Sequence, residues 1–134
     1  MTMYHVDVYR DDRWWMIRIP ELDGVNGVDE PLTQARRYSE IETQARDLIA
    51  LVADVAPSTI ELDLHVTVEN LDVTESAEQI AKDRATAAAA ERRAVHQSAV
   101  VAHQLKDAGV TLRDIGEIVG VSFQRAGQLV AEPV

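Results

Sequence analysis

The chain has 134 residues, a formal net charge of −10 and no cysteine. This length suits one compact domain plus a small appendage, and the absence of thiols excludes disulfides and thiolate chemistry. The polar start and the lack of any apolar run near the roughly 20 residues of a membrane span lead us to expect a cytoplasmic protein with no signal peptide and no membrane contact.

The charge is unevenly distributed along the chain. Residues 1–73 carry 15 acidic residues against 6 arginines, a net charge of −9, whereas residues 74–134 carry 8 acidic against 7 basic residues. The first part should repel nucleic acid and attract a basic partner, while the nearly neutral second part is compatible with DNA. The asymmetry indicates two separate functions.

The first twenty residues predict a β-hairpin. Residues 4–9 and 14–20 alternate between two kinds of side chain, as a half-buried strand does, and the polar run 10–13 between them indicates a turn. Residues 21–31 are dense in Gly, Asn, Asp and Pro, which is typical of a loop.

Residues 32–36 fit either a third strand or the start of a helix, and we favour a strand because a better helix start follows. Ser39 and Glu42 have the spacing of a capping box, in which the serine oxygen accepts the N3 amide and the glutamate reaches back. Five apolar residues then recur at steps of four and three, which predicts an amphipathic helix that ends before Pro57. These residues are Ile41, Ala45, Leu48, Val52 and Val55.

The clearest strand pattern follows this helix, over residues 60–68. Residues 1–72 are therefore predicted to form an α+β domain of order β-β-β-α-β, in which one helix covers one face of an antiparallel-rich sheet. The other face is left to solvent or to a partner, and an exposed Trp is uncommon enough to suggest binding. The predicted partner-binding residues are Tyr9, Trp14, Met16 and Arg18.

From Glu75 to Ala108 the chain consists mostly of helix-forming residues and contains no Gly or Pro, which predicts one long helix, with residues 73–98 as a spacer. Its apolar seam is narrow and rich in Ala, so a weak dimer seam and a partly exposed spacer fit about equally well. Gly109 ends the helix as a C′ residue would.

Residues 99–134 predict a helix-turn-helix, because two short amphipathic helices meet at the Gly-Val-Ser run of residues 120–122. Thr111 and Ser122 fit the N-caps of the two helices. In this arrangement the start of the second helix enters the major groove, where Gln pairs with adenine, Arg with guanine and Phe with the thymine methyl group. The predicted DNA-binding residues are Thr111, Arg113, Ser122, Phe123, Gln124, Arg125 and Gln128.

Only three residues in this region are basic, Lys106, Arg113 and Arg125, so one copy would bind DNA weakly. Specific binding of operator DNA would need a homodimer, or a higher even oligomer, that holds two units about one helical turn apart. The alternative is a three-helix cluster that only closes the chain or makes a dimer.

Catalytic and metal chemistry is weakly indicated. Four acidic residues of the loop after the hairpin suggest Mg²⁺, but two of them flank glycine, where Asp forms turns. The four histidines lack both metal-ligand spacing and cysteine companions. We therefore expect no metal, no cofactor and no enzymatic activity, and we rank a metal-dependent nuclease as the least favoured alternative.

Three segments resemble the HicB-like antitoxin family of type II toxin–antitoxin systems, particularly its actinobacterial branch: YHVDVYRDDRWWMIRIPELDGV, TQARRYSEIETQARDLIALV and IELDLHVTV. A paired Trp, a Pro-Glu-Leu and a Thr-Gln-Ala-Arg run carry the resemblance, which covers about residues 4–68. The family's usual Gly-Asp-Thr before the helix is replaced here by Arg37-Tyr38-Ser39, and the long Ala-rich helix is unusual for it.

The resemblance implies a partial ribonuclease-H-like fold that neutralises a small basic mRNA-cleaving toxin of the HicA type. It also implies that a C-terminal DNA-binding module represses the operon. We therefore expect an antitoxin-like transcriptional repressor, with a solitary HicB-like DNA-binding regulator that has no toxin partner as the alternative.

Overall fold

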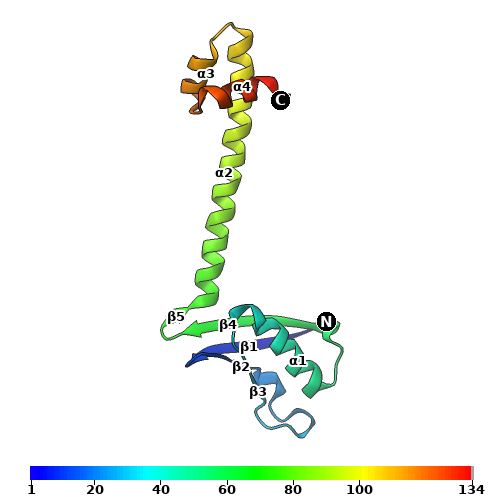
Figure 1. The fold of residues 1–134 in the computed structure, drawn as a ribbon. Coiled ribbons are helices and arrows are strands. Elements are labelled where there is room, and N and C mark those ends of the chain that lie inside the picture. The colour runs from blue at the N-terminus through cyan, green and yellow to red at the C-terminus, as the bar shows by residue number, and fades with distance from the viewer. Residues whose placement is uncertain (134) are drawn as a thin grey trace. The chain divides into compact units, whose positions relative to one another are not determined.

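In the computed structural model, which describes residues 1–133, the N-terminal part of the chain forms a five-stranded mixed sheet of order β3-β2-β1-β4-β5 (Figure 1). The strands are β1 (Thr2–Asp11), β2 (Trp14–Arg18), β3 (Leu32–Ala35), β4 (Ile60–Val68) and β5 (Leu71–Asp72). The first three strands pair antiparallel, β1 and β4 pair in parallel, and β5 is antiparallel to β4. The predicted α+β class is confirmed, and β5 is an addition to the predicted strand order.

One face of the sheet is covered by α1 (Ile41–Ala53). The strands alternate as their sequence predicts: Val6 and Val8 of β1 and Ile17 of β2 are buried on the face that α1 covers, where apolar burial stabilises the unit. The buried core consists of Val6, Val8, Ile17, Ile19, Leu22, Ala35, Ile41, Ala45, Ile49, Val52, Ile60 and Val66. Of the predicted helical stripe, Leu48 is only half-buried and Val55 follows the helix end, while Ile49 takes the buried position.

The start of α1 differs from the prediction. A 3₁₀ turn (Tyr38–Glu40) precedes the helix, and Glu40 occupies the N-cap position with no side-chain cap hydrogen bond. Ser39 therefore lies inside a turn rather than in the extended conformation that an N-cap residue adopts. The predicted capping box is wrong for this reason.

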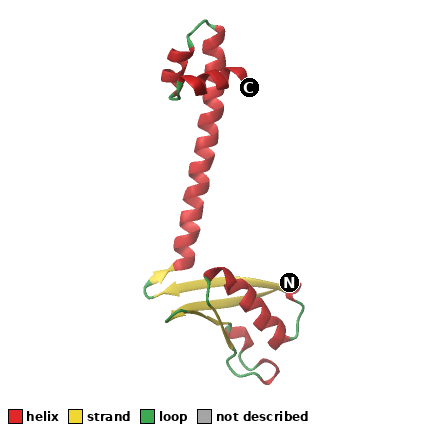
Figure 2. Cartoon of the chain, viewed as in Figure 1, coloured by secondary structure: helices red, strands yellow, loops and turns green. Residues whose placement is uncertain are grey.

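A single helix, α2 (Val73–Asp107), joins two compact units, Met1–Ile80 and a second unit that begins at Ala81 (Figure 2). Its N-terminus is capped by Asp72, whose Oδ1 accepts the backbone N–H of Glu75 at 2.9 Å. Over residues 77–97 every side chain is exposed except the half-buried Ala89. Within the described residues, no helix is both long enough and apolar enough to cross a membrane.

The second unit consists of the last turns of α2 together with α3 (Leu112–Val119) and α4 (Phe123–Ala131). Its small core consists of the buried residues Ala102, Ile115, Ala126 and Leu129, surrounded by half-buried aliphatic side chains. Ala102 is the one member of the predicted α2 seam that is fully buried. The apolar stripes of the two short helices thus pack against each other and against the end of α2 in the core of this unit.

Candidate functional site

The turn between α3 and α4 is closed by backbone hydrogen bonds. The backbone N–H groups of Gly120 and Val121 both donate to the carbonyl oxygen of Gly116, the latter at 2.8 Å. Gly120 adopts a left-handed conformation with φ of 78°. A Cβ atom at Gly116 would lie 2.8 Å from the Val121 carbonyl oxygen, so only glycine allows this close approach.

Both predicted helix caps are present. The Thr111 Oγ1 accepts the backbone N–H of Asp114 at 3.3 Å, and the Ser122 Oγ accepts the backbone N–H of Arg125 at 3.1 Å. The caps satisfy amides at helix starts, which are the groups that also suit phosphate oxygens. Six of the seven predicted DNA-binding residues are exposed: Thr111, Arg113, Ser122, Phe123, Gln124 and Gln128.

Arg125 departs from the outward orientation expected for it. Its side chain is half-buried; Nη1 donates to Gln128 Oε1 at 3.1 Å and lies 3.5 Å from Glu132 Oε1. Gln128 lies one turn after Arg125 on α4 and Glu132 directly follows the helix, so the Arg125 side chain is held along α4 and at its C-terminal end. Phe123, with 57% of its surface exposed, and Gln124 are the freer side chains of the first turn.

The end of α4 is fastened to α2. The ring Nε2 of His103 lies 2.6 Å from the carbonyl oxygen of Glu132 and donates to it, because a carbonyl oxygen can only accept. This bond fixes the C-terminal end of α4 against the helix that carries Ala102. At the opposite end, among residues 1–133, the side chains of Phe123 and Gln124 make no hydrogen bond or ion pair.

The charge of the second unit is close to neutral. Residues 81–134 carry 7 basic and 6 acidic residues, a net charge of +1, whereas residues 1–80 carry 6 arginines and 17 acidic residues, a net charge of −11. Within the described part of α3 and α4, Arg113 is the basic side chain without an ion pair. The two units therefore suit ligands of opposite charge.

The open face of the sheet, opposite α1, carries the four predicted partner-binding residues. The strand register pairs Tyr9 with Met16, which puts them side by side. Tyr9 is 43% exposed, but Trp14, Met16 and Arg18 are half-buried. The surface is therefore more covered than the sequence suggested.

Contacts with neighbouring side chains explain why Trp14 and Arg18 are only partly exposed. The guanidinium carbon of Arg36, just after β3, lies 5.2 Å above the Trp14 ring. The Arg18 Nη2 donates to Asp23 Oδ2 at 2.6 Å. β3, which lies beside β2, brings Arg36 over Trp14, while Asp23 comes from the loop that directly follows β2; the hairpin sequence alone reveals neither contact.

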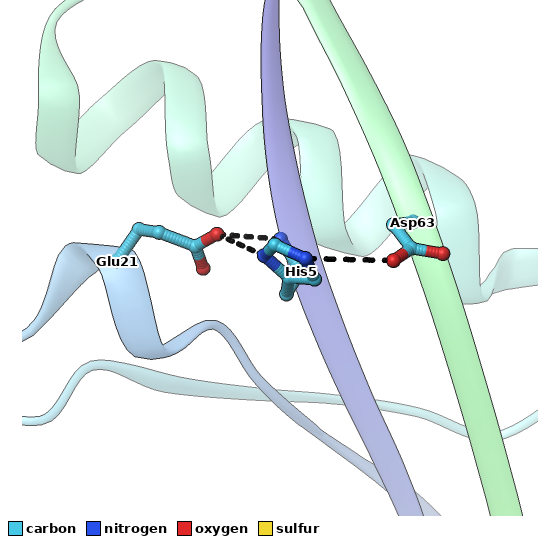
Figure 3. Close-up of polar contacts among 3 residues, drawn as sticks. All are labelled: His5, Glu21 and Asp63. Carbon is cyan, nitrogen blue, oxygen red and sulfur yellow. Dashed lines mark hydrogen bonds and ion pairs between the residues drawn. The ribbon is translucent and has the colours of Figure 1, made fainter.

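The same face carries a cluster of histidines and carboxylates that the sequence analysis missed. The ring Nδ1 of His5 donates to Glu21 Oε2 at 2.6 Å, and its Nε2 lies 3.5 Å from Asp63 Oδ2 (Figure 3). The backbone N–H of His5 donates to the same Glu21 oxygen at 2.9 Å. His65 Nε2 lies 3.2 Å from Asp72 Oδ2.

The signal for this cluster lies in two short runs, His-Val-Asp over residues 5–7 and Asp-Leu-His over residues 63–65. Both runs place His and Asp on outward positions, and parallel pairing of β1 with β4 sets His5 beside Asp63 and Asp7 beside His65. Because the register cannot be read from either strand alone, the histidines looked isolated.

The carboxylates alter the protonation of this cluster. The hydrogen bond and the negative charge of Glu21 raise the pKa of His5 above 6.5. Partial burial raises the pKa of Glu21, but the hydrogen bonds from the backbone and ring of His5 outweigh it and leave this pKa below 4.5. For Asp72, the hydrogen bond from the Glu75 amide, followed by that from His65, lowers the pKa.

The cluster lines a shallow open cleft of about 320 Å³ in the first unit. Its lining residues are His5, Asp7, Asp63, Leu64, His65, Asp72, Thr74, Glu75 and Glu78. Five of these are carboxylates, so the cleft favours cationic groups. Among residues 1–133, no group of three or more His, Asp or Glu side chains is arranged to hold a metal ion.

The chain matches no protein-family model, no curated protein and no solved structure.

Proposed function

We propose that this protein is an antitoxin-like transcriptional repressor. Its C-terminal helix-turn-helix binds operator DNA, and its acidic N-terminal unit neutralises a small basic mRNA-cleaving toxin of the HicA type by covering it. The observation that carries the DNA-binding half is the capped first turn of α4, which presents Phe123 and Gln124 to solvent on a rigid turn.

The exposed groups fit the chemistry of DNA recognition. Gln124 and Gln128 can make paired hydrogen bonds with adenine, and Phe123 can contact a thymine methyl group. Thr111, Arg113 and Ser122 lie at the helix starts, where phosphate contacts set the register. Arg125 reaches a guanine only after releasing Glu132, so it contributes to recognition less directly than Gln124.

An even oligomer is part of the proposal because a unit with a net charge of +1 has too few cations to hold DNA alone. Two copies double both the phosphate contacts and the base contacts. The half-sites of the operator then lie about 10 base pairs, or a multiple of this spacing, apart.

The antitoxin half is supported by charge and by the HicB-like segments. A net charge of −11 on residues 1–80 and the carboxylate-lined cleft suit a basic protein. The open face with Tyr9, Trp14, Met16 and Arg18 lies on the same side of the sheet as the cleft.

A gel shift on the promoter of the gene itself tests the DNA-binding half. Gln124→Ala should weaken binding by at least about thirtyfold, since a dimer loses one paired base contact in each half-site and each contributes roughly 1–3 kcal/mol. The matched control is Gln104→Ala, an exposed glutamine on α2. Unchanged binding in Gln124→Ala would mean that α4 does not read the DNA.

Co-expression with a small basic reading frame beside the gene tests the antitoxin half separately. A stoichiometric complex that abolishes mRNA cleavage is expected. If the promoter is bound but no such reading frame or complex exists, the protein is a solitary regulator.

A further inference from the structure

A second surface of the N-terminal unit lies between the C-terminal half of α1, the loop before β3 and the start of β3. It is a groove of about 550 Å³ lined by Asn26, Val28, Pro31, Leu32, Leu48, Leu51 and Val52. All but one of these residues are apolar. We call it the α1–β3 groove.

The loop wall of the groove is fixed in place. The Asn26 Nδ2 donates to the carbonyl oxygen of Val52 at 2.7 Å, which fastens the loop to α1. The backbone N–H of Gly24 donates to the Val28 carbonyl oxygen at 2.8 Å, and Val25 packs against the core. Because the loop is already ordered, little conformational entropy of the loop is lost when a ligand binds.

Three large apolar side chains at this groove are exposed. Leu51 is 80% exposed, Leu32 is 47% exposed and Val28 is 37% exposed. Exposed aliphatic side chains that gather around a concavity are typical of a binding surface, because leaving them in water forfeits hydrophobic stabilisation. Leu51 stands out because α1 otherwise buries its aliphatic side chains at least halfway.

The rim of the groove is acidic. Asp47 lies one turn before Leu51 on α1, Asp54 directly follows the end of this helix, and Asp29 and Glu30 belong to the loop wall. Within the described residues, none of these four carboxylates has an ion-pair partner. A ligand of the groove should therefore be apolar at its centre and basic at its ends.

We propose that the α1–β3 groove is a docking site for a basic segment of a partner protein, with aliphatic side chains that cover Leu51 and flanking Lys or Arg residues that face the rim carboxylates. The lining residues of the groove differ from the four residues assigned to the open face, although Leu32 at its β3 edge pairs with Arg18 of that face. If the proposed function is correct, this basic segment belongs to the toxin. The identification of the partner as a toxin rests on the proposed function, whereas the binding of a basic segment does not.

A second copy of this chain fits the groove poorly. Symmetric pairing of the same surface would bring the four rim carboxylates against their own copies. The charge of the rim therefore favours a basic protein over self-association.

The test measures the binding of fluorescein-labelled synthetic peptides to the full chain by fluorescence anisotropy. The probe has a Leu-x-x-Leu centre flanked by Lys and Arg; one control peptide has Ser in place of Leu, and another has Glu flanks. Saturable binding of the first peptide alone is expected. Leu51→Lys should weaken it by about tenfold, since it removes a buried leucine contact and repels the flanks.

Ile80→Lys is the matched control, because it also replaces an exposed aliphatic helix residue of the first unit and changes the charge equally. It should leave the affinity within about twofold. As a second pair, Asp47→Asn with Asp54→Asn should weaken binding and flatten its salt dependence, whereas Asp11→Asn with Asp12→Asn in the β1–β2 turn should not.

Several outcomes would overturn the proposal. They are the absence of saturable binding, equal binding of the Ser-centred peptide, and equal effects of Leu51→Lys and Ile80→Lys. A change of oligomeric state in Leu51→Lys, measured by light scattering, would instead make the groove an interface between copies. DNA binding is measured separately, so its failure is distinguishable from failure of the groove.

Discussion

At Gly116 the backbone of the turn after α3 approaches this helix so closely that a single methyl group decides whether the turn can form. A Cβ at this position would lie 2.8 Å from the Val121 carbonyl oxygen, while a Cβ at Gly127 would lie 3.8 Å from a Leu112 methyl group, an ordinary contact. Gly116 therefore cannot be replaced by alanine without a shift of the backbone, whereas Gly127 can.

Gly116→Ala should destabilise the C-terminal unit by about 1–3 kcal/mol, because the backbone at Val121 cannot move without opening the turn. Gly127→Ala should be neutral or stabilise it by up to about 1 kcal/mol, since alanine favours a helix. Urea denaturation followed by circular dichroism measures both. Equal effects of the two substitutions would contradict the close approach.

Glu21→Gln should lower the pKa of His5 towards 6.5, since the carboxylate that raises it is removed. The raised pKa of His5 means that the pair stabilises the folded state below the unfolded pKa and that this part is lost as pH rises through the folded pKa. The lowered pKa of Glu21 acts oppositely: its contribution is present above 4.5 and is lost as pH falls through the folded pKa.

An NMR titration of the His5 ring in both proteins checks this prediction, with His96 on α2 as the internal control. The stability difference between wild type and Glu21→Gln should shrink towards high pH. A pKa of His5 that does not change in Glu21→Gln would mean that the 2.6 Å contact does not persist in solution.

At the scale of elements, the same residue type has different roles at two helix starts. Ser122 caps α4 through its side chain, whereas Ser39 lies in a 3₁₀ turn and caps nothing. Both serines precede an amphipathic helix, so the distinction depends on the backbone conformation just before each helix.

Ser122→Ala should destabilise the C-terminal unit by about 1 kcal/mol through loss of the cap, and should also weaken DNA binding. Ser39→Ala should change stability by less than about 0.5 kcal/mol, as an exposed substitution without a partner does. Thermal unfolding of the two variants measures the contrast. A loss of stability in Ser39→Ala larger than this would indicate that Ser39 does cap α1, contrary to the structure.

At the scale of the whole molecule, charge separates the two functions that we propose. The first unit carries −11 and the second +1, so one chain can attract a basic protein and still tolerate DNA. This division makes the dependence of DNA binding on salt informative, because few cations contribute to it.

Arg113→Ala should reduce the slope of log K against log salt for operator binding by about 2, one unit for each half-site of a dimer. The affinity should fall similarly on all sequences, since a phosphate contact carries no base information. Gel shifts at several salt concentrations measure the slope, with Arg84→Ala on the exposed part of α2 as the control. A slope that changes by about 1 would indicate a single bound copy.

The elements whose signal is local could be predicted from the amino-acid sequence. Alternation over β1, β2 and β4, the stripe of α1, the long α2 and the caps at Thr111 and Ser122 follow from neighbours a few residues apart. The positions of the two short helices after Gly109 and the contrast between an acidic first part and a nearly neutral second part were predictable for the same reason.

Contacts between residues far apart in the sequence became visible once the fold was known. The parallel register of β1 with β4 places His5 beside Asp63, β3 brings Arg36 over Trp14, and the loop at Asn26 closes one wall of the α1–β3 groove. Strand register, edge neighbours and loop conformation depend on contacts between segments far apart in sequence, and no periodicity within one segment encodes them.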